Sequence, residues 1–196
     1  MTQKKIQPWK KSGEPVVLAN KYGRKLISQQ FLNPTTGREE EFSLFAGKDW
    51  SIVLPITKDG GVIAVRQYKQ GCDQIVLELP AGAVDANDKN PTETIERELL
   101  EETGYKAEKV ITLDPPLFMA TRSSPVRFHA FFAINCEKIQ EAKIDASEEI
   151  ETEIFPLGDW IKMCLSEIVE PSSIVATFRS LPYLKQTFGS DFNVLF

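Results

Sequence analysis

The chain is 196 residues long with 42% hydrophobic and 26% charged residues, the composition of a soluble globular protein of about one ordinary domain. Its formal net charge of −5 argues against nucleic acid as a partner, because phosphate backbones select basic surfaces. The sequence has no apolar run of about 18 residues that could span a membrane and no apolar secretory signal near its start, so we expect a cytoplasmic protein without a membrane partner.

The first 48 residues are expected to form a small sheet of their own. Turn signals rich in Gly, Pro and Asn separate three short runs with strand character, which predicts an antiparallel meander. These runs cover residues 16–18, 25–32 and 41–45. Residues 1–13 are polar and are expected to be loosely held. Because a sheet of three strands is marginal alone, this region needs something to pack against.

The core domain is expected to begin near Trp50 and to open with a β-hairpin. Lys58-Asp59-Gly60-Gly61 is a strong hairpin signal between two apolar runs. The second run ends in Arg66-Gln67-Tyr68-Lys69, whose two cations are either solvated strand charges or contacts for an anionic substrate. A third strand then leads to a tight Pro-Ala-Gly turn. The three predicted strands cover residues 51–56, 62–68 and 75–79.

The clearest helix in the sequence lies between Asn90 and Gly104. Asn90 is a good N-cap, a proline follows at the first helical position, and Glu93 completes a capping-box pattern. Gly104 supplies the left-handed conformation that ends a helix. Ile95 and Leu99 lie one turn apart and are expected to face the core.

Three glutamates on this helix, Glu98, Glu101 and Glu102, lie at i, i+3 and i+4, so their carboxylates crowd one edge. Like charges at this spacing destabilise a helix by roughly 0.2–0.5 kcal/mol per pair, and Arg97 is placed to relieve part of the repulsion. A carboxylate cluster beside a Pro-Ala-Gly turn supplies the oxygen ligands that Mg²⁺ requires. Taken alone, the same residues also fit a solvated acidic helix face.

After this helix the sequence predicts further strands and two closing helices. A loop rich in Pro and Ser precedes an aromatic-rich strand, and a second acidic segment at 144–151 precedes a short strand. The apolar positions of the closing helices are expected to pack on the sheet. The predicted strands cover 110–113 and 127–134, the short strand ends at 154–157, and the helices cover 159–165 and 172–184.

Two segments resemble a known enzyme family. Arg97 to Tyr105 matches the second half of the Nudix hydrolase box, G-x5-E-x7-R-E-U-x-E-E-x-G-U (U is aliphatic or aromatic), at every fixed position. Leu77-Glu78-Leu79-Pro80-Ala81-Gly82 is similar to the segment that precedes this helix in the ADP-ribose and nucleotide-sugar pyrophosphatase branch.

The first half of the box departs from the family pattern. The distance from Gly82 to Arg97 is one residue longer than the box allows, and Lys89 stands where the first glutamate is expected. Asp85 and Asp88 are the candidates to replace that glutamate, which in the family mostly supports the loop. The departure therefore affects the expected loop geometry more than the expected chemistry.

The resemblance implies an α/β fold, the Nudix α/β/α sandwich with a mixed sheet, together with the small N-terminal antiparallel strand region. Residues 49–196 would form the Nudix domain. In this branch, an N-terminal strand region like residues 1–48 packs across a homodimer and helps to build the nucleotide site, so the chain is expected to be a homodimer.

The resemblance also implies a metal site and a general base. The Ala81 carbonyl, Glu98 and Glu102 would hold Mg²⁺, with Mn²⁺ as an alternative ion. Glu101 would be an auxiliary ligand and a second catalytic candidate, and Glu148 would complete the site and act as the base. Glu149 and Glu151 are the alternatives for that base.

Four residues are expected to contact the substrate on the same grounds: Arg66, Lys69, Arg122 and Ser124. Trp9, Phe31 and Trp50 could stack on a base, but each is more often plain packing. The implied reaction is hydrolysis of a nucleoside diphosphate sugar, such as ADP-ribose, to a nucleoside monophosphate and a sugar phosphate. The alternatives are another nucleoside diphosphate derivative, or a non-catalytic sensor that binds a nucleotide. The three cysteines form no metal pattern and are expected to be reduced thiols.

Overall fold

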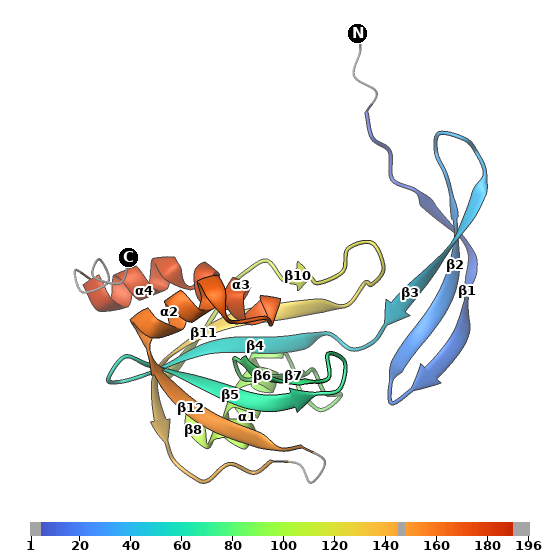
Figure 1. Cartoon of the computed structure of the whole chain (residues 1–196). Coiled ribbons are helices and arrows are strands. Elements are labelled where there is room, and N and C mark those ends of the chain that lie inside the picture. The colour runs from blue at the N-terminus through green and yellow to red at the C-terminus, as the bar shows by residue number, and fades with distance from the viewer. Residues whose placement is uncertain (1–4, 145–147, 190–196) are drawn as a thin grey trace. The chain divides into compact units, whose positions relative to one another are not determined.

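The computed structural model describes residues 5–144 and 148–189, and the chain forms two compact units (Figure 1). The smaller unit contains residues 1–48 together with 118–126. The larger unit contains residues 49–117 and 127–196. The segment 118–126 therefore belongs in space with the N-terminal region, although the division expected from the sequence assigned it to the other domain.

The smaller unit is the predicted antiparallel meander, with strand order β1-β2-β3. Its strands are β1 (Lys10–Lys21), β2 (Arg24–Leu32) and β3 (Glu39–Ala46). Tyr22 and Gly23 form the tight turn between β1 and β2, with φ of 51° and 77°. The expectation that residues 1–13 are loosely held is wrong for the end of that segment, because Lys10, Lys11 and Ser12 already pair with β2.

Aromatic rings pack together in this small sheet. Trp9 and Phe31 both contact Phe42 edge-on, with ring centroids 5.7 and 5.6 Å apart respectively. In the larger unit, Trp50 stacks on Phe128 at 5.1 Å. The three rings considered for base stacking thus each have a partner inside their own unit.

The larger unit is built on a mixed sheet with the order β11-β4-β5-β12 at its centre. β4 (Trp50–Thr57) and β11 (Arg127–Lys138) run parallel, and β5 (Gly61–Lys69) and β12 (Ile150–Pro156) are antiparallel. The remaining strands are short. Two of them pair with the hairpin strands: β6 (Gln74–Glu78) with β5, and β7 (Ala81–Ala83) with β4. The other three lie beside β11: β8 (Tyr105–Lys106), β9 (Lys109–Thr112) and β10 (Leu117–Phe118).

The hairpin strands β4 and β5 diverge, and this divergence makes room for a bend. They pair only at Ile56 and Val62, beside the hairpin turn. Further along, β6 pairs with β5 and β7 pairs with β4. The bend between β6 and β7 therefore lies where the two strands separate, and the Val53 N–H donates to the Pro80 carbonyl at 3.1 Å.

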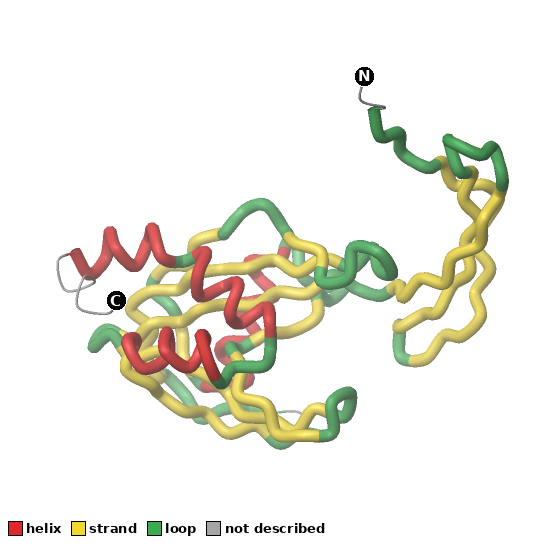
Figure 2. The backbone as a smooth tube through the Cα atoms, turned by 45° about the horizontal axis from the view of Figure 1, so that its top comes forward, coloured by secondary structure: helices red, strands yellow, loops and turns green. Residues whose placement is uncertain are grey.

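Helices cover both faces of this sheet (Figures 1 and 2). The helix α1 (Pro91–Thr103) lies on one face, and α2 (Leu157–Ser166), α3 (Pro171–Arg179) and α4 (Leu181–Phe188) lie on the other. This confirms the α/β/α sandwich. Within the described ranges, no helix is both long enough and apolar enough to cross a membrane.

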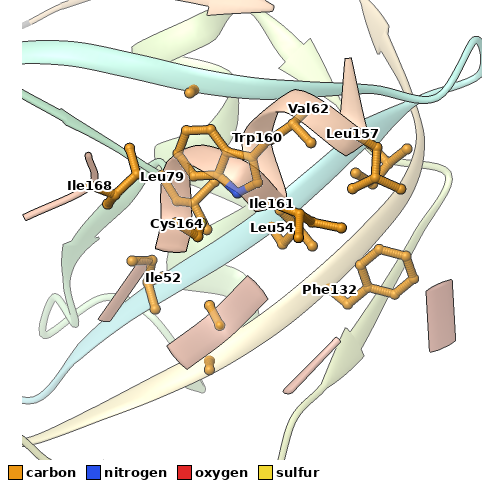
Figure 3. Close-up of a cluster of buried hydrophobic side chains, with 14 of the residues drawn as sticks. Ile52, Leu54, Val62, Leu79, Phe132, Leu157, Trp160, Ile161, Cys164 and Ile168 are labelled. Atoms are coloured by element: carbon orange, nitrogen blue, oxygen red, sulfur yellow. The ribbon is translucent and has the colours of Figure 1, made fainter. Parts of the chain in front are cut away.

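The two faces bury separate apolar clusters. Trp160 of α2 is fully buried against Leu54 and Val62 in the larger cluster (Figure 3), and its indole N–H donates to Thr177 at 2.9 Å. On the other face Ile95 and Leu99 of α1 are each 1% exposed, as predicted from their spacing.

The prediction of one continuous helix over residues 172–184 is wrong, because the chain breaks at Ser180 into α3 and α4. Pro182 has no backbone N–H with which to continue the helical hydrogen bonds. The Ser180 N–H instead closes α3 onto the Ala176 carbonyl, and the Ser180 carbonyl accepts from Tyr183 and Leu184.

Candidate active site

The ends of α1 are fixed largely as the sequence predicts. The Asn90 side chain accepts from the N–H groups of Thr92 and Glu93 at 2.9 and 3.1 Å, and Gly104 has φ of 76°. The predicted capping box is wrong in one respect. The Glu93 carboxylate accepts from the Lys89 N–H at 2.9 Å, one residue before the cap, and its other oxygen pairs with the Lys89 ammonium at 3.2 Å.

Asp88 is the acid that ties the preceding loop to α1. Its carboxylate accepts from Arg97 Nη2 at 3.1 Å, from the Thr94 hydroxyl at 2.9 Å and from the Asp85 N–H at 2.8 Å. Hydrogen bonding from Arg97 is the main reason that the pKa of Asp88 falls to about 2. The Asp85 carboxylate lies farther from Arg97 Nη2, at 3.8 Å. Of the two candidates for the displaced loop glutamate, the geometry therefore favours Asp88.

The bend at Ala81 and Gly82 lies directly against the carboxylates of α1. The Ala81 N–H donates to Glu102 Oε2 at 3.2 Å. A Cβ atom added to Gly82 would come within 2.0 Å of the Glu98 carboxylate carbon, so any other residue here would require the Glu98 side chain to move. The tight turn and the acidic helix edge, which the sequence places 15 or more residues apart, are thus neighbours in space.

At this bend the carboxylate of Glu102 is buried and that of Glu98 is partly buried, and their negative charges repel each other. Burial raises the pKa of Glu102 well above its usual range, and the charge of Glu98 adds to this shift. Burial also raises the pKa of Glu98, although Arg97 opposes the shift. The negative charge of Glu148 contributes to the raised pKa of Glu98, so Glu148 lies within electrostatic reach of the bend. A cation bound here would relieve this accumulation of negative charge.

The donor atoms at the bend suit a hard divalent cation, although they are not yet gathered around one point. They are carboxylate oxygens together with the backbone carbonyl of Ala81, which are the ligand types of Mg²⁺. In the described part of the chain, however, no group of three His, Cys, Asp or Glu residues converges closely enough to hold a metal. Arg97 Nη1 instead bridges Glu98 Oε1 and Glu101 Oε2 at 2.8 and 2.9 Å. A metal bound here would therefore share these two carboxylates with Arg97.

The second acidic segment reaches this region from the start of β12. Glu148 and Glu149 are exposed and directly follow residues 145–147, which lie outside the described residues. Glu151 is paired in register with Arg66 of β5, whereas Thr152 contacts the Glu102 carbonyl at 3.4 Å. Because side chains alternate along a strand, Glu151 points to the opposite face from Thr152 and α1. Of the three glutamates considered as bases, Glu151 is therefore the least well placed.

The two cations predicted on β5 also point to opposite faces. Arg66 forms a two-pronged ion pair with Glu153 of β12, at 2.5 and 3.2 Å, on the face away from α1. Lys69 lies on the α1 face, where its ammonium is 2.5 Å from Glu78 Oε1. Successive side chains of a strand point to opposite faces of the sheet, so two residues three positions apart lie on opposite faces. Lys69 is thus brought to the carboxylates of the bend, and Arg66 is not.

Sequence reasoning missed Glu78 as a member of this cluster. Glu78 is the last residue of β6, is 7% exposed and contributes to the raised pKa of Glu102. Burial raises the pKa of Glu78 itself, and Lys69 opposes that shift. A signal was present, because Glu78 is the one charged residue in the apolar run Ile75-Val76-Leu77-Glu78-Leu79.

Arg122 and Ser124 belong to the smaller unit. The Ser124 hydroxyl donates to the Phe45 carbonyl at 2.7 Å and accepts from the Val126 N–H at 3.2 Å, so it holds the loop 118–126 against β3. Arg122 is exposed. Substrate contact by either residue stays a prediction.

A separate pocket of about 900 Å³ lies at the hairpin end of the sheet. It is lined by residues 57–61, 136–138, 156–158 and by Tyr105, Ile154 and Phe188. Its described lining includes none of the carboxylates of the bend. The carboxylate cluster, and not this pocket, is therefore the candidate active site.

The chain is similar to known proteins in sequence and in fold. The NUDIX domain model matches residues 47–168. An ADP-ribose pyrophosphatase of Bacillus subtilis (strain 168) is 30% identical over 118 residues, covering 60% of this chain and 63% of that protein. The methanol dehydrogenase activator of Bacillus methanolicus is 36% identical over 58 residues, 30% of this chain and 31% of its own length. The matched region thus spans less than two thirds of either relative.

A crystal structure of an ADP compounds hydrolase superposes with a TM-score of 0.80, covering 94% of this chain and 98% of the other. The two sequences are only 20% identical, so this likeness establishes the shared fold alone.

Proposed function

Because the chain belongs to the NUDIX domain family, we propose that it hydrolyses the diphosphate linkage of a nucleoside diphosphate sugar, ADP-ribose or a similar compound. The products would be a nucleoside monophosphate and a sugar phosphate. The observation that carries this proposal is the packing of the Ala81-Gly82 bend against the partly buried carboxylate of Glu98 and the buried carboxylate of Glu102. Such a cluster of buried negative charge suits a divalent cation, which in turn suits a diphosphate.

In this proposal the Ala81 carbonyl, Glu98 and Glu102 hold Mg²⁺ or Mn²⁺, with Glu101 as an auxiliary ligand and Glu148 completing the site. A bound cation would neutralise phosphate charge and lower the pKa of the attacking water. Glycine at position 82 lets the backbone approach the Glu98 carboxylate closely.

The chain's own residues would perform the remaining steps. Glu148 takes the proton of the attacking water as general base, with Glu149 as the second candidate for the base. Lys69, on the same face as the carboxylates, binds a phosphate oxygen of the substrate. The hydrogen-bonded ion pair between Asp88 and Arg97 holds the preceding loop against the acidic edge of α1.

We also propose that the smaller unit forms a homodimer. Val16, Val17 and Leu18 of β1 are 60, 53 and 54% exposed, and Phe45 of β3 is 62% exposed, so the small sheet leaves apolar side chains without cover. Residues 1–48 carry nine Lys and Arg against four Glu, whereas the whole chain carries 23 Lys and Arg against 28 Asp and Glu. A basic small unit would therefore be attracted to the acidic larger unit of a second copy.

Light scattering at micromolar concentration tests this dimer. The proposal predicts the mass of two chains for the wild type and a shift toward one chain for Val17→Lys. A wild type with the mass of one chain at that concentration would count heavily against it.

We also expect the protein to act in the cytoplasm. Its three cysteines are free thiols, which suits a reducing compartment.

The activity is tested with a panel of ADP-ribose and other nucleotide sugars, incubated with Mg²⁺ and a phosphatase that releases phosphate from the products. Release from one or more nucleotide sugars is the expected result. Release only from a dinucleoside polyphosphate or a coenzyme A derivative would move the proposal to another Nudix substrate. Nucleotide binding without any release would indicate a sensor.

A further inference from the structure

The Lys69 ammonium is held at a specific place by two acceptors from neighbouring strands. It pairs with Glu78 Oε1 at 2.5 Å and also donates to the side-chain oxygen of Gln67. Across the β5–β6 ladder, Glu78 lies opposite Val65, whereas Lys69 lies opposite Gln74. The Lys69 side chain therefore runs back along β5, past Gln67, to reach a carboxylate four residues behind its own position in the ladder.

This backward course brings the ammonium to the carboxylates of α1. Glu78 is buried and Lys69 is partly exposed, so the pair has one side in the sheet and one side open to solvent. The charge of Lys69 lowers the pKa of Glu102, and the charge of Glu78 raises it, so both groups lie within electrostatic reach of that carboxylate. Glu78 and Gln67 together hold the Lys69 side chain in its course back over the strand.

We propose that Glu78 is a positioning residue: with Gln67 it holds the Lys69 ammonium beside the helix carboxylates, where that ammonium binds an oxygen of the substrate's diphosphate. This inference rests on the proposed function for the identity of the substrate. A buried acid suits this task because a lysine is a flexible point charge, and a fixed partner reduces the freedom that it loses on binding phosphate.

Kinetics of single and double variants test the inference. Glu78→Gln and Lys69→Met should each raise KM for ADP-ribose about tenfold and change kcat less than about threefold, since both remove binding rather than a step of the reaction. The double variant should lose no more than the worse single variant, because the two residues act as a unit. Independent effects that multiply in the double variant would overturn the inference.

The chain offers a matched control. Glu153→Gln breaks the Arg66–Glu153 ion pair, which joins β5 to β12 on the opposite face of the same sheet. This variant should leave KM unchanged within about twofold, whereas an equal rise in KM would show that the effect is a general response to removing an ion pair from the sheet. If Glu78→Gln instead raises the Mg²⁺ concentration needed for half-maximal activity, Glu78 is a metal ligand and the positioning role is wrong.

A binding measurement separates failure of this inference from failure of the proposed function. The probe is the α,β-methylene analogue of ADP-ribose, whose bridging carbon resists hydrolysis, titrated calorimetrically with Mg²⁺ present. Coupled losses of affinity of about tenfold in Glu78→Gln and Lys69→Met support the inference even if the wild type hydrolyses no nucleotide sugar. No binding to the wild type, or unchanged binding to both variants, overturns it while leaving any measured hydrolysis intact.

Discussion

The two faces of the sheet in the larger unit bury very different groups. The face under α2 and α3 is apolar around Trp160, and its buried indole N–H has a hydroxyl partner. The face under α1 is apolar at Ile95 and Leu99 but turns acidic at its edge, where Glu98 and Glu102 have raised pKa values. The first face stabilises the fold, whereas the second retains carboxylates whose charged form is disfavoured by burial. Such carboxylates fit the proposed cation site, because a bound cation would compensate their charge.

Replacing Glu102 with Gln should separate these two roles most strongly. The amide can still accept the Ala81 N–H, but it removes a buried negative charge. We expect turnover of nucleotide sugars to fall at least about 10²-fold, while the melting temperature without metal stays equal or rises. Steady-state kinetics and thermal denaturation measure the two effects. Glu96→Gln, at an exposed position of the same helix, should change neither, and a fully active Glu102→Gln enzyme would remove the metal assignment.

Replacing Glu148 with Gln tests whether the acidic face also supplies the base. Loss of a general base lowers kcat about 10²–10⁴-fold, and the fold should be unaffected because Glu148 is exposed. Glu151→Gln is the matched comparison, since Glu151 points to the other face, and it should retain nearly full activity. A loss below tenfold in Glu148→Gln would direct the search to Glu149.

Replacing Trp160 with Ala on the apolar face should have the opposite effect: a loss of stability with little change in activity. Trp160 is 0% exposed, so the cavity should cost about 3–5 kcal/mol of unfolding free energy, measured by urea denaturation. The activity of the remaining folded protein should be nearly unchanged. Trp160→Phe leaves a smaller cavity and keeps the comparison measurable if the Ala variant does not fold. A large fall in kcat without loss of stability would contradict the division between the faces.

Replacing Asp88 with Asn should weaken the acidic face indirectly. Asp88 holds Arg97, which in turn contacts Glu98 and Glu101, so the change should lower metal affinity or activity about 10–100-fold. The control is Asp85→Asn, where the carboxylate lies 3.8 Å from Arg97 and the effect should be smaller. Equal losses in both variants would show that Asp88 has no special role in the loop.

Thiol labelling leaves the protein unmutated and measures how accessible the interior is on each face of the sheet separately. Cys136 lies in the cluster under α1 and Cys164 in the cluster under α2. Burial raises the pKa of Cys136 to about 12 and also raises that of Cys164, whereas Cys72 is exposed. At pH 8 mass spectrometry should find one rapidly modified thiol in the native protein and three in urea. Rapid native modification of Cys136 would show that the α1 face opens readily.

Local patterns in the sequence predicted much of this molecule. Asn90 and Gly104 gave both ends of α1, and the spacing of Ile95 and Leu99 gave its buried side. The break at Ser180 was missed because the apolar spacing continues through it, although Pro182 indicated the interruption. Such errors arise where two local signals compete.

The site was less predictable, because its members are joined by long-range packing. The sequence identified the helix glutamates and placed Arg97 to relieve the repulsion one turn before Glu101, which the structure confirms, but it did not show that the same nitrogen also contacts Glu98. Arg66 and Lys69 were treated alike, although strand alternation places them on opposite faces. Glu78 was not predicted, because Lys69 does not lie opposite it in the strand ladder. The two charges meet only because the long Lys69 side chain runs back along β5.

The most direct test of the central claim is Mn²⁺ binding, followed by electron paramagnetic resonance with Mg²⁺ as competitor, in the absence of any nucleotide. The wild type should bind at least one ion that Mg²⁺ displaces, and Glu98→Gln combined with Glu102→Gln should weaken that binding at least about tenfold. Equal Mn²⁺ affinity in the wild type and the double variant would contradict the claim that the carboxylates of Glu98 and Glu102 beside Ala81 and Gly82 hold a divalent cation.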